Sequence, residues 1–450
     1  MKNGDYFAGK HCLILGLAKS GFAAAVLLHR LGAKIVVNDR QPLDDDPHAS
    51  QLRKLGIEVI GGSHPDHLLD QKPFDLVIKN PGIPYRNRVV AEAEKRGIPI
   101  WTEPEIAGIL SSAPFIAITG SNGKTTTTTL IGEILRAAGK NPNVAGNIGT
   151  VVCEVAAEAD PDQVIVTELS SFQLLGMERF RAQIAVLLNV YDAHLDYHGS
   201  REAYEQAKAK IFANQTAEDF AVINGDDETV RRLAERTPAT KVAFSHSDRT
   251  ASVNVCDGMI RYEGESIIKK TELLLPGDHN LENVMAAVAV CKLYGVENEV
   301  LASVLRTFRG IRHRLQFVKT VSGRKFYNDS KATNTLATQK ALAAFSQPVV
   351  LIAGGLDRGN DFDDMVDAFK KLKALVTYGE TGEKFTALAK RAGMDRVKHV
   401  DDLEEAVPAA YELSSPGDVV LLSPACASWD QFRTFEERGD MFIDCVHKLR

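Results

Sequence analysis

Residues 120–126, GSNGKTT, have the residue types and the spacing of a loop that binds phosphate groups. The two glycines lack Cβ atoms, so the backbone between them can wrap closely around an anion. Lys124 adds a positive charge, and the hydroxyl of Thr125 can coordinate Mg²⁺. The general phosphate-loop pattern has a glycine where this chain has Ile118. A glycine turn followed by an exposed lysine is therefore the structural alternative.

Two further polar residues follow predicted strands. The apolar run 164–167 predicts a buried strand, and Glu168 at its tip stands where such domains hold Mg²⁺ or a bound water. The run 184–188 predicts the next strand, and His194 lies in the loop after it. A single histidine in a loop is as readily a solvated surface residue, so His194 alone does not define a site.

Lys208 lies on the apolar face of a predicted helix that Ser200 can cap. Tyr204, Lys208 and Ile211 share that face, because residues three and four apart are neighbours on a helix. An unpaired ammonium group on an inward face is costly. Either the lysine extends its charged end to the surface, or it meets an anion, or it is itself modified.

A second glycine-rich stretch, GLAKSG at 16–21, lies between a predicted strand at 11–15 and a helical run. Its spacing is similar to that of a dinucleotide-binding turn, and Asp39 after the next strand is placed to bind a ribose hydroxyl. Ala18 replaces the middle glycine and disfavours close approach of a pyrophosphate. A dinucleotide site and a purely structural turn both remain open.

The composition is that of an ordinary globular protein. The chain has 450 residues, 44% of them hydrophobic and 25% charged, with a net charge of −6. This length suits about three domains, and the charge gives no general attraction to nucleic acid or to an anionic membrane. The six cysteines are dispersed, as expected of buried thiols in a reducing compartment. With no apolar signal core and no apolar run near the length of a membrane span, we expect a cytoplasmic protein.

Strands and helices alternate along the whole sequence, which predicts an α/β fold in three domains. We expect a Rossmann-like N-terminal domain at 1–112. A central P-loop ATPase-like domain with a mostly parallel sheet follows at 113–310. A Rossmann-like α/β C-terminal domain occupies 311–450. A strand, a turn and an apolar helix are expected over 273–295.

Polar residues also follow predicted strands in the third domain. Asp329 could accept hydrogen bonds from ribose hydroxyls, and Lys331 could donate to a phosphate or a carboxylate. The last predicted helix begins at Trp429, with Ser428 and Gln431 as its capping box.

Several motifs together resemble the Mur ligases of peptidoglycan synthesis. They are TGSNGKTTT, VAGNIGT, ELSSFQ, the His194 loop with Lys208, GDHNLEN, His313-Arg314 and NDSKATN. The Gly-Lys-Thr-Thr sequence alone is shared with folylpolyglutamate synthetases. NDSKATNT, AGGLDRGNDF and LLSPACASWDQFRTFEERGDMF look like the D-glutamate-adding members, and the sequence lacks the DNPR tetrapeptide typical of the next ligase. The resemblance extends from Gly16 to near Phe442.

This resemblance implies ATP-dependent ligation of D-glutamate to UDP-N-acetylmuramoyl-L-alanine. The substrate carboxylate would become an acyl phosphate, the amine of D-glutamate would attack it, and phosphate would leave the tetrahedral intermediate. ADP and phosphate are the other products. The implied cofactors are ATP, two Mg²⁺ ions and a carbamylated lysine at Lys208. No nucleic acid or membrane is implied as a partner, and a monomer is expected.

The functional positions of the family carry over residue by residue. The implied catalytic residues are Lys124, Asn147, His194 and Lys208; the implied metal ligands are Thr125, Glu168, His194 and carbamylated Lys208. The implied ATP site comprises Gly120, Ser121, Asn122, Gly123, Lys124, Thr125, Thr126, Asn283, Arg314, Asp329 and Lys331. The implied substrate sites comprise Lys19, Ser20, Asp39, Arg40, Asn80, Gly82, Ser171 and Gln173, with Thr333, Arg358, Ser428 and Phe435 for D-glutamate.

The chain departs from the family pattern at two places. Arg358 replaces a lysine, and it offers a two-pronged contact to a carboxylate where lysine offers a point charge. Ala18-Lys19 replaces Gly-Leu, and the lysine could reach a pyrophosphate directly. The alternative functions are another Mur-type or folylpolyglutamate-type ligase, a nucleotide-binding regulator without ligase activity, and an NAD oxidoreductase that uses GLAKSG.

Overall fold

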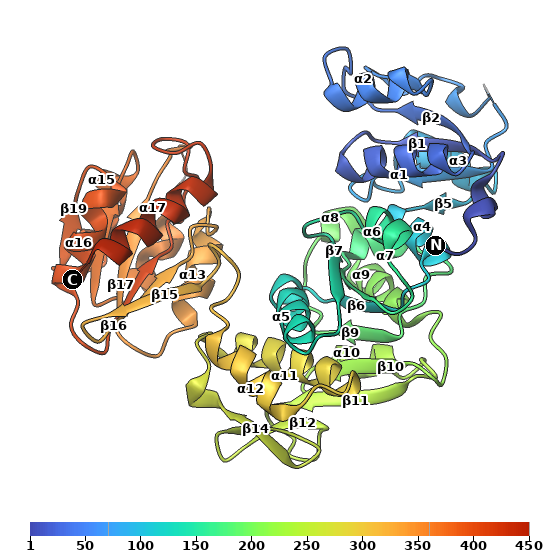
Figure 1. The fold of residues 1–450 in the computed structure, drawn as a ribbon. Helices are drawn as coiled ribbons and strands as arrows, with labels where there is room; N and C mark the ends of the chain where they lie inside the picture. Colours follow the sequence, from blue (N-terminus) through green and yellow to red (C-terminus); the bar gives the residue numbers. More distant parts are fainter. Residues whose placement is uncertain (71, 360, 450) are drawn as a thin grey trace. The chain divides into compact units, whose positions relative to one another are not determined.

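The computed structural model describes residues 1–70, 72–359 and 361–449 (Figure 1). Asn360 of the AGGLDRGNDF motif thus lies outside the described residues. Unit 1 comprises Met1–Lys269 and Glu282–Val304, and unit 2 comprises Lys270–Leu281 and Leu305–Arg450. Two sheets lie in unit 1 and one in unit 2. The α/β fold is confirmed, whereas the boundaries 1–112, 113–310 and 311–450 stay a prediction.

The first sheet of unit 1 has the strand order β3-β2-β1-β4-β5, all parallel. Its strands are β1 His11–Leu15, β2 Lys34–Asn38, β3 Glu58–Ile60, β4 Leu76–Lys79 and β5 Ile100–Trp101. Alternate residues of β1 pack on opposite faces, as the period of a strand requires. Cys12 and Ile14 join the core under α1 (Lys19–Arg30) and α2 (Pro47–Lys54). Leu13 and Leu15 join the core under α3 (Arg88–Lys95).

The second sheet has nine strands in the order β14-β13-β12-β11-β10-β9-β6-β8-β7. Pairs from β7 to β12 are parallel. These strands are β6 Phe115–Thr119, β7 Pro142–Gly146, β8 Val164–Glu168, β9 Ile184–Leu187, β10 Phe220–Asn224, β11 Thr240–Ser245 and β12 Val253–Cys256. Their helices are α4 Glu103–Leu110, α5 Lys124–Ala137, α6 Val152–Glu158, α7 Ser171–Leu175, α8 Leu195–His198, α9 Arg201–Ala209 and α10 Glu228–Ala234.

An antiparallel extension ends this sheet. Strands β13 (Met259–Tyr262) and β14 (Glu265–Lys269) continue from β12 through tight turns. Asp257 and Gly258 both have positive φ, as do Glu263 and Gly264. Such pairs form the two-residue turns whose twist matches antiparallel strands. Helices α11 (Asp278–Leu293) and α12 (Asn298–Thr307) follow (Figure 1).

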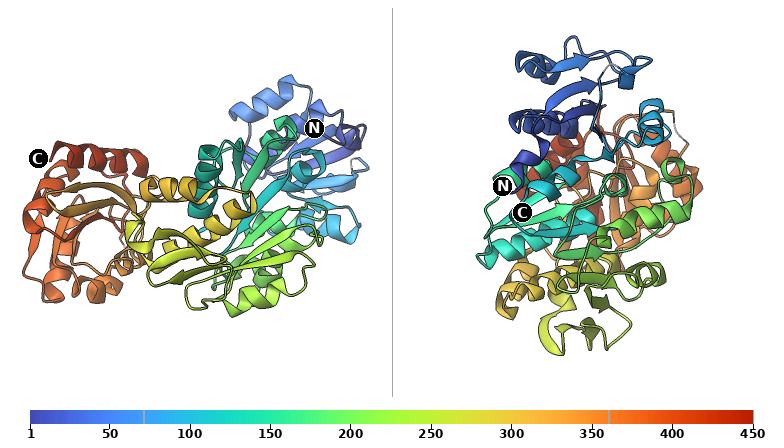
Figure 2. Two further views of the ribbon diagram at one scale, coloured as in Figure 1. Left: turned by 60° about the horizontal axis from the view of Figure 1, so that its bottom comes forward. Right: turned by 90° about the vertical axis from the view of Figure 1, so that its right-hand side faces the viewer.

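The sheet of unit 2 has the order β15-β16-β20-β17-β18-β19, and only β15 is antiparallel within the described residues. The strands are β15 Gln316–Val321, β16 Arg324–Asn328, β17 Val349–Gly354, β18 Ala374–Tyr378, β19 Val397–His399 and β20 Val419–Leu422. The helices are α13 Thr335–Ala343, α14 Val366–Phe369, α15 Gly382–Arg391, α16 Leu403–Leu413 and α17 Phe435–Lys448. Buried residues on both faces of this sheet form two cores under these helices. Figure 2 shows these strands and helices from two further sides, in orange to red.

Two expectations were wrong. Residues 273–275 form no strand, because a short 3-10 helix (Lys270–Glu272) and a loop precede α11. No helix begins at Trp429 either; α17 begins at Phe435, with Thr434 accepting a hydrogen bond from the Glu437 amide. Gln431 donates its side-chain amide to the Asp401 carbonyl instead of closing a capping box with Ser428.

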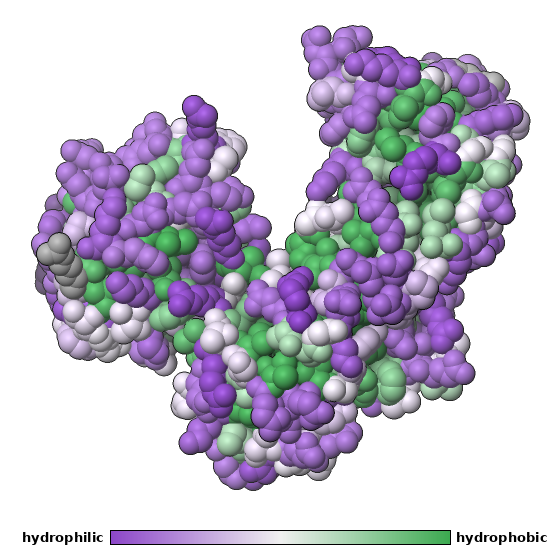
Figure 3. All heavy atoms as spheres, in the orientation of Figure 1, coloured by the Kyte–Doolittle hydropathy of each residue, from purple (hydrophilic) through white to green (hydrophobic). Residues whose placement is uncertain are grey.

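Hydrophilic residues cover much of the face drawn in Figure 3, with smaller hydrophobic areas between them. In the described part of the chain, no helix combines the length and the apolar character needed to cross a membrane.

Candidate functional site

The phosphate-loop sequence lies at the carboxyl edge of the second sheet. Strands β9, β6, β8 and β7 are neighbours in that sheet, so the segments that follow them meet at one edge. The loop after β6 leads directly into α5, whose N-cap is Gly123 with φ 83°. A Cβ atom at Gly123 would collide with the Asn283 side chain, which also accepts a hydrogen bond from Thr127 at 3.3 Å. Backbone N–H groups at the N-terminus of such a helix form a site for phosphate.

The predicted catalytic lysine, the hydroxyl and the carboxylate lie within this loop and beside it. Lys124 Nζ donates to the carbonyl oxygens of Gly120 (2.9 Å) and Ser121 (3.2 Å). Thr125 Oγ1 donates to one oxygen of the buried Glu168 at 2.8 Å, and Asn147 Nδ2 donates to the other at 2.9 Å. The sequence therefore predicted correctly that these side chains lie together, although their roles stay a prediction.

Lys208 is turned inward. Its side chain is 1% exposed, on the same buried face as Tyr204 and Ile211. Its Nζ donates to the Gly120 carbonyl at 2.7 Å and lies 4.7 Å from the centre of the Tyr204 ring. Burial lowers the pKa of Lys208 well below its usual value, and the charge of Lys124 lowers it further. The amine therefore loses its proton more readily than that of an ordinary lysine, and the buried side chain does not extend to the surface.

His194 lies in the loop before α8, with positive φ of 56°. Its ring is 4.9 Å from the ring of Phe172. Sequence reasoning missed His198, one helical turn further on, although the spacing of the two histidines was visible. His198 Nε2 lies 3.0 Å from Ser171 Oγ. Burial, then His194 and Lys208, lower the pKa of His198 to about 4, so its ring is neutral near pH 7.

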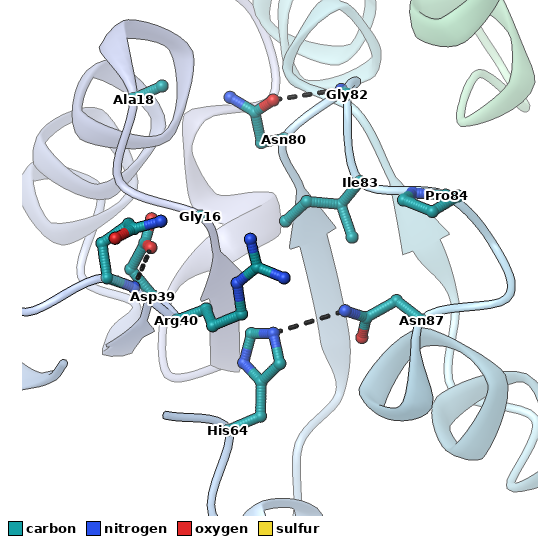
Figure 4. A pocket seen from close by; sticks show the side chains of 11 residues that line it. Gly16, Ala18, Asp39, Arg40, His64, Asn80, Gly82, Ile83, Pro84 and Asn87 are labelled. Atoms are coloured by element: carbon teal, nitrogen blue, oxygen red, sulfur yellow. Dashed lines mark hydrogen bonds between the residues drawn. The ribbon is translucent and has the colours of Figure 1, made fainter. Parts of the chain in front are cut away.

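A cavity of about 340 Å³ lies at the carboxyl edge of the first sheet. The strand order reverses between β1 and β4, and open α/β sheets bind ligands at that point. The cavity is lined by Gly16, Ala18, Asp39, Arg40, Gln41, His64, Asn80, Gly82, Ile83, Pro84 and Asn87. Figure 4 shows the Arg40 side chain extending into it. Four predicted substrate residues thus share one cavity, whereas His64 and Asn87, which sequence reasoning missed, complete it.

Several predicted substrate residues are held by the protein itself. Asp39 accepts hydrogen bonds from the amides of Leu17 (2.7 Å) and Gln41 (2.8 Å). Asn80 Nδ2 donates to Ser20 Oγ at 3.2 Å, and Lys19 Nζ donates to the Gly149 carbonyl at 2.5 Å. Asp39 and Asn80, which line the cavity, are thereby held in place, whereas Lys19 and Ser20 lie outside its lining.

Gln173 and Ser171 lie on α7 instead of in the cavity lining. The side-chain oxygen of Gln173 accepts hydrogen bonds from the amide and the hydroxyl of Ser170, each at 2.9 Å, in a capping box. That oxygen is therefore occupied in fixing the start of α7, and Ser171 is bonded to His198.

In unit 2 the loops after the neighbouring strands β16, β20 and β17 carry the remaining predicted residues. Asp329 is buried and accepts from the Leu315 amide (3.1 Å) and Ser423 Oγ (2.9 Å). Burial raises its pKa to about 7. Arg314, on the exposed side of this site, lowers that pKa by its charge. Lys331 Nζ lies 5.6 Å from the centre of the Phe435 ring.

Residues Thr333, Arg358 and Ser428 lie on these same loops. Arg358 stacks on the exposed ring of Trp429, with 4.8 Å between guanidinium and ring centre. Ser428 is 2% exposed. Sequence reasoning missed Arg438, a fully buried arginine that joins two of the loops. It donates to Ser330 Oγ (3.0 Å) and to the Cys426 carbonyl (3.0 Å).

The residues around Glu168 fit a Mg²⁺ ion. Mg²⁺ in nucleotide sites takes oxygen ligands, commonly one or two carboxylates together with phosphates and water. Glu168 and Thr125 supply a carboxylate and a hydroxyl whose oxygens are 2.8 Å apart. Among the described residues no three His, Cys, Asp or Glu side chains gather into a metal cluster, so an ion here would draw its other ligands from a nucleotide and water.

A mostly parallel sheet, a phosphate loop leading into α5 and a carboxylate at the end of β8 define a P-loop nucleotide-binding protein. The chain belongs to the Mur ligase family. Family models match as the MurD-like N-terminal domain (residues 10–102), the Mur ligase middle domain (118–291) and the Mur ligase glutamate ligase domain (313–426).

Similar proteins of the same length carry one name. The chain is 58% identical to UDP-N-acetylmuramoylalanine--D-glutamate ligase from Geobacillus sp. (strain WCH70) and from Bacillus subtilis (strain 168), and 53% identical to that of Bacillus cereus (strain Q1). Each similarity covers all of both chains.

Solved structures share the fold at low identity. UDP-N-acetylmuramate-alanine ligase MurC from Thermotoga maritima has a TM-score of 0.56 at 20% identity and covers 97% of this chain and 99% of its own. MurF from Acinetobacter baumannii has a TM-score of 0.55 at 18% identity and covers 100% of this chain and 93% of its own.

Proposed function

We propose that this chain joins D-glutamate to UDP-N-acetylmuramoyl-L-alanine at the expense of ATP in the synthesis of peptidoglycan precursors. The observation that carries the choice of substrates is the full-length similarity, at up to 58% identity, to relatives that bear this name. The site around residues 120–126 suits any ligase that activates a carboxylate with ATP, so it supports the reaction class. The choice of D-glutamate as the amino acid rests on the similarity to the relatives.

The reaction follows from the chemistry of its groups. The substrate carboxylate attacks the γ-phosphorus of ATP, and ADP leaves. The amine of D-glutamate then attacks the acyl phosphate, loses a proton, and expels phosphate from the tetrahedral intermediate. Positioning and neutralisation of charge govern such a phosphoryl transfer. We assign charge neutralisation at the β/γ-phosphates to Lys124, and the hold on the phosphates to the amides of 120–126.

We assign Mg²⁺ to Thr125 and Glu168, and a second ion to His194 together with Lys208. Mg²⁺ would neutralise phosphate charge as the γ-phosphoryl group transfers. Asn147 donates to the Glu168 oxygen that Thr125 does not bind, at 2.9 Å, and so orients the carboxylate.

We also propose that Lys208 is carbamylated. A neutral buried amine can add to CO₂, releasing one proton and gaining a carboxylate. The low pKa of Lys208 supports this step, because a charged ammonium has no lone pair. The product turns a costly buried amine into an anionic ligand.

The nucleotide and amino-acid sites extend to residues of the chain that the sequence singled out. We assign Asn283, Arg314, Asp329 and Lys331 to ATP, the cavity of the first sheet to the UDP group, and Thr333, Arg358, Ser428 and Phe435 to D-glutamate. We place the reaction in the cytoplasm and keep the domain boundaries 1–112, 113–310 and 311–450.

Phosphate release tests this function. The full chain is supplied with ATP, Mg²⁺ and UDP-N-acetylmuramoyl-L-alanine, and then with D-glutamate, L-glutamate or a diamino acid in turn. We expect release only with D-glutamate. Turnover with another acceptor would place the chain elsewhere in the family, and ATP binding without turnover would support a regulator.

A further inference from the structure

We propose that Lys79 and Tyr197 form a positioning pair that couples the cavity of the first sheet to the His194 helix. This inference rests on the proposed function, because it takes the UDP-linked substrate as the ligand whose binding in the cavity fixes the positions of Lys79 and Tyr197. The pair joins β4 of the first sheet to α8 beside the second sheet, 118 residues apart in sequence.

Lys79 is held entirely by neutral oxygens. It is 1% exposed, and its Nζ donates to the carbonyls of Ile83 (2.9 Å) and Pro81 (3.3 Å) and to the hydroxyl of Tyr197 (3.1 Å). The ammonium also lies 4.9 Å from the ring centre of Tyr85. Both carbonyls belong to the segment between Asn80 and Pro84, which lines the cavity. Lys79 therefore holds this cavity-lining segment in place through two of its carbonyls.

Tyr197 binds the same two carbonyls as Lys79. Its hydroxyl lies 2.8 Å from the Pro81 carbonyl and 2.9 Å from the Ile83 carbonyl, and its single proton serves one of them at a time. A second bridge runs alongside, from Arg86 Nη1 to the Asp196 carbonyl at 2.8 Å. One strand-end loop thus contacts α8 through two independent bridges.

Helix α8 transmits the position of Tyr197 to His194. The amide of Tyr197 donates to the His194 carbonyl at 3.1 Å. The ring of Phe172 packs against both side chains, 4.3 Å from the Tyr197 ring and 4.9 Å from the His194 ring. A shift of the Asn80–Pro84 segment therefore moves the residue that we assign to the second metal ion.

Stability alone does not explain a lysine at this place. Burial lowers the pKa of Lys79 to about 8, with no carboxylate among the described residues to offset that cost. An apolar side chain of similar length would avoid the desolvation of the ammonium. A buried polar group of this kind is better explained by the single geometry that its hydrogen bonds specify.

Hydrogen–deuterium exchange on the full chain tests the coupling. Backbone exchange over residues 194–199 is measured with and without UDP-N-acetylmuramoyl-L-alanine in the wild type, Lys79→Met and Tyr197→Phe. We expect the ligand to slow exchange in the wild type and to slow it about tenfold less in each variant, the size expected for loss of one hydrogen bond to a charged group. Tyr294→Phe, which removes a hydroxyl bonded to Gln183 at 2.9 Å, is the matched control and keeps the wild-type response.

Steady-state kinetics supply a second test, because a merely structural role of the pair would not change the KM for one substrate selectively. We expect KM for the UDP-linked substrate to rise about tenfold in both variants, with KM for ATP and for D-glutamate unchanged. The double variant should be no worse than the poorer single variant, because the two residues act as one unit.

Two results would overturn the coupling: wild-type exchange over 194–199 that does not change when the ligand binds, or a ligand response in both variants equal to that of Tyr294→Phe. Ligand-dependent protection without any D-glutamate-dependent phosphate release would overturn the proposed function and leave the coupling standing.

Discussion

The amines of two lysines donate to the same carbonyl oxygen in the phosphate loop, that of Gly120. Lys124 Nζ and Lys208 Nζ donate to the Gly120 carbonyl from 2.9 and 2.7 Å. Two ammonium groups so close repel each other, and burial falls more heavily on Lys208. Lys208 is therefore the amine that loses its proton more readily than an ordinary lysine, as the proposed carbamylation requires.

Replacement of Lys208 by alanine should nearly abolish ligation. The variant loses the amine, and with it the anionic ligand that we propose is built on it. Acetate or formate at high concentration should restore part of the phosphate release by supplying a carboxylate in the vacated space. Lys210→Ala is the control, because Lys210 instead donates to the Leu175 carbonyl at 2.6 Å. Unchanged turnover in Lys208→Ala would contradict the role.

Replacement of Lys124 by alanine should lower kcat about 10²-fold or more, since its charge matters most while the γ-phosphoryl group departs. KM values should change less, because the loop amides still hold the phosphates. Steady-state phosphate release measures both constants. Lys140, exposed beyond the other end of α5, provides the comparison variant Lys140→Ala. Equal kcat in the two variants would remove Lys124 from the reaction.

At the scale of elements, the start of α5 depends on a residue without a side chain. Gly123 and Gly139 flank the two ends of α5 with similar positive φ, 83° and 71°. A Cβ atom at Gly123 meets Asn283, whereas one at Gly139 meets nothing within 4 Å. The two positions thus share their backbone strain, and they differ in the collision with Asn283 and in the place of Gly123 within the phosphate loop.

We expect Gly123→Ala to lose ATP binding and to melt at lower temperature than Gly139→Ala. The strain common to both is about 1 kcal/mol, so any further loss of thermal stability in Gly123→Ala reports the displacement of Asn283. Calorimetric titration with ATP and thermal unfolding measure the two effects. Identical behaviour of the two variants would mean that the Asn283 contact is dispensable.

Sequence patterns identified elements that carry their own signals. The inward face of α9 followed from helical spacing, and the strands before Glu168 and His194 followed from apolar runs. The strand expected over 273–275 was wrong because a short apolar run does not by itself specify a strand, and here it forms a half-buried loop. Two cap signals compete near the C-terminus, and the structure uses Thr434 with Glu437 instead of Ser428 with Gln431.

Residues that act across the fold had no such signal. Lys79 meets Tyr197, Arg438 meets Ser330, and His64 meets Asn87 only after distant segments come together. The antiparallel strands β12–β14 were missed despite a readable signal, since Asp257-Gly258 is a typical hairpin turn. The site was therefore predictable where its residues lie in recognisable motifs, and not where a single residue outside any motif meets a distant partner.

At the scale of the whole molecule, buried acids make stability depend on pH. Glu103 on α4 is buried and accepts from the Cys153 amide of α6 at 3.0 Å. Burial raises its pKa from 4.5 to about 7. Between these two values the folded chain holds a proton that the unfolded chain has released, so the free energy of unfolding falls as pH rises through this window.

Glu103→Gln should remove that dependence. The amide oxygen can still accept from Cys153 but does not ionise, so the variant should gain stability relative to the wild type as pH rises through the interval from 4.5 to 7. Chemical unfolding across this range measures the difference. Glu154→Gln, an exposed glutamate on α6, is the control. A constant difference between Glu103→Gln and wild type would contradict the assignment.

The chain has two tryptophans, and they fall in different units. Trp101 in unit 1 is 3% exposed and stacks near Tyr6, whereas Trp429 in unit 2 is 63% exposed beside Arg358. A buried indole fluoresces at shorter wavelength than a hydrated one, so the emissions of Trp101 and Trp429 differ in wavelength. Intrinsic fluorescence therefore reports on the two units separately. Ligand binding at the Arg358 loop changes the long-wavelength emission of Trp429, and loosening of the first sheet changes the short-wavelength emission of Trp101.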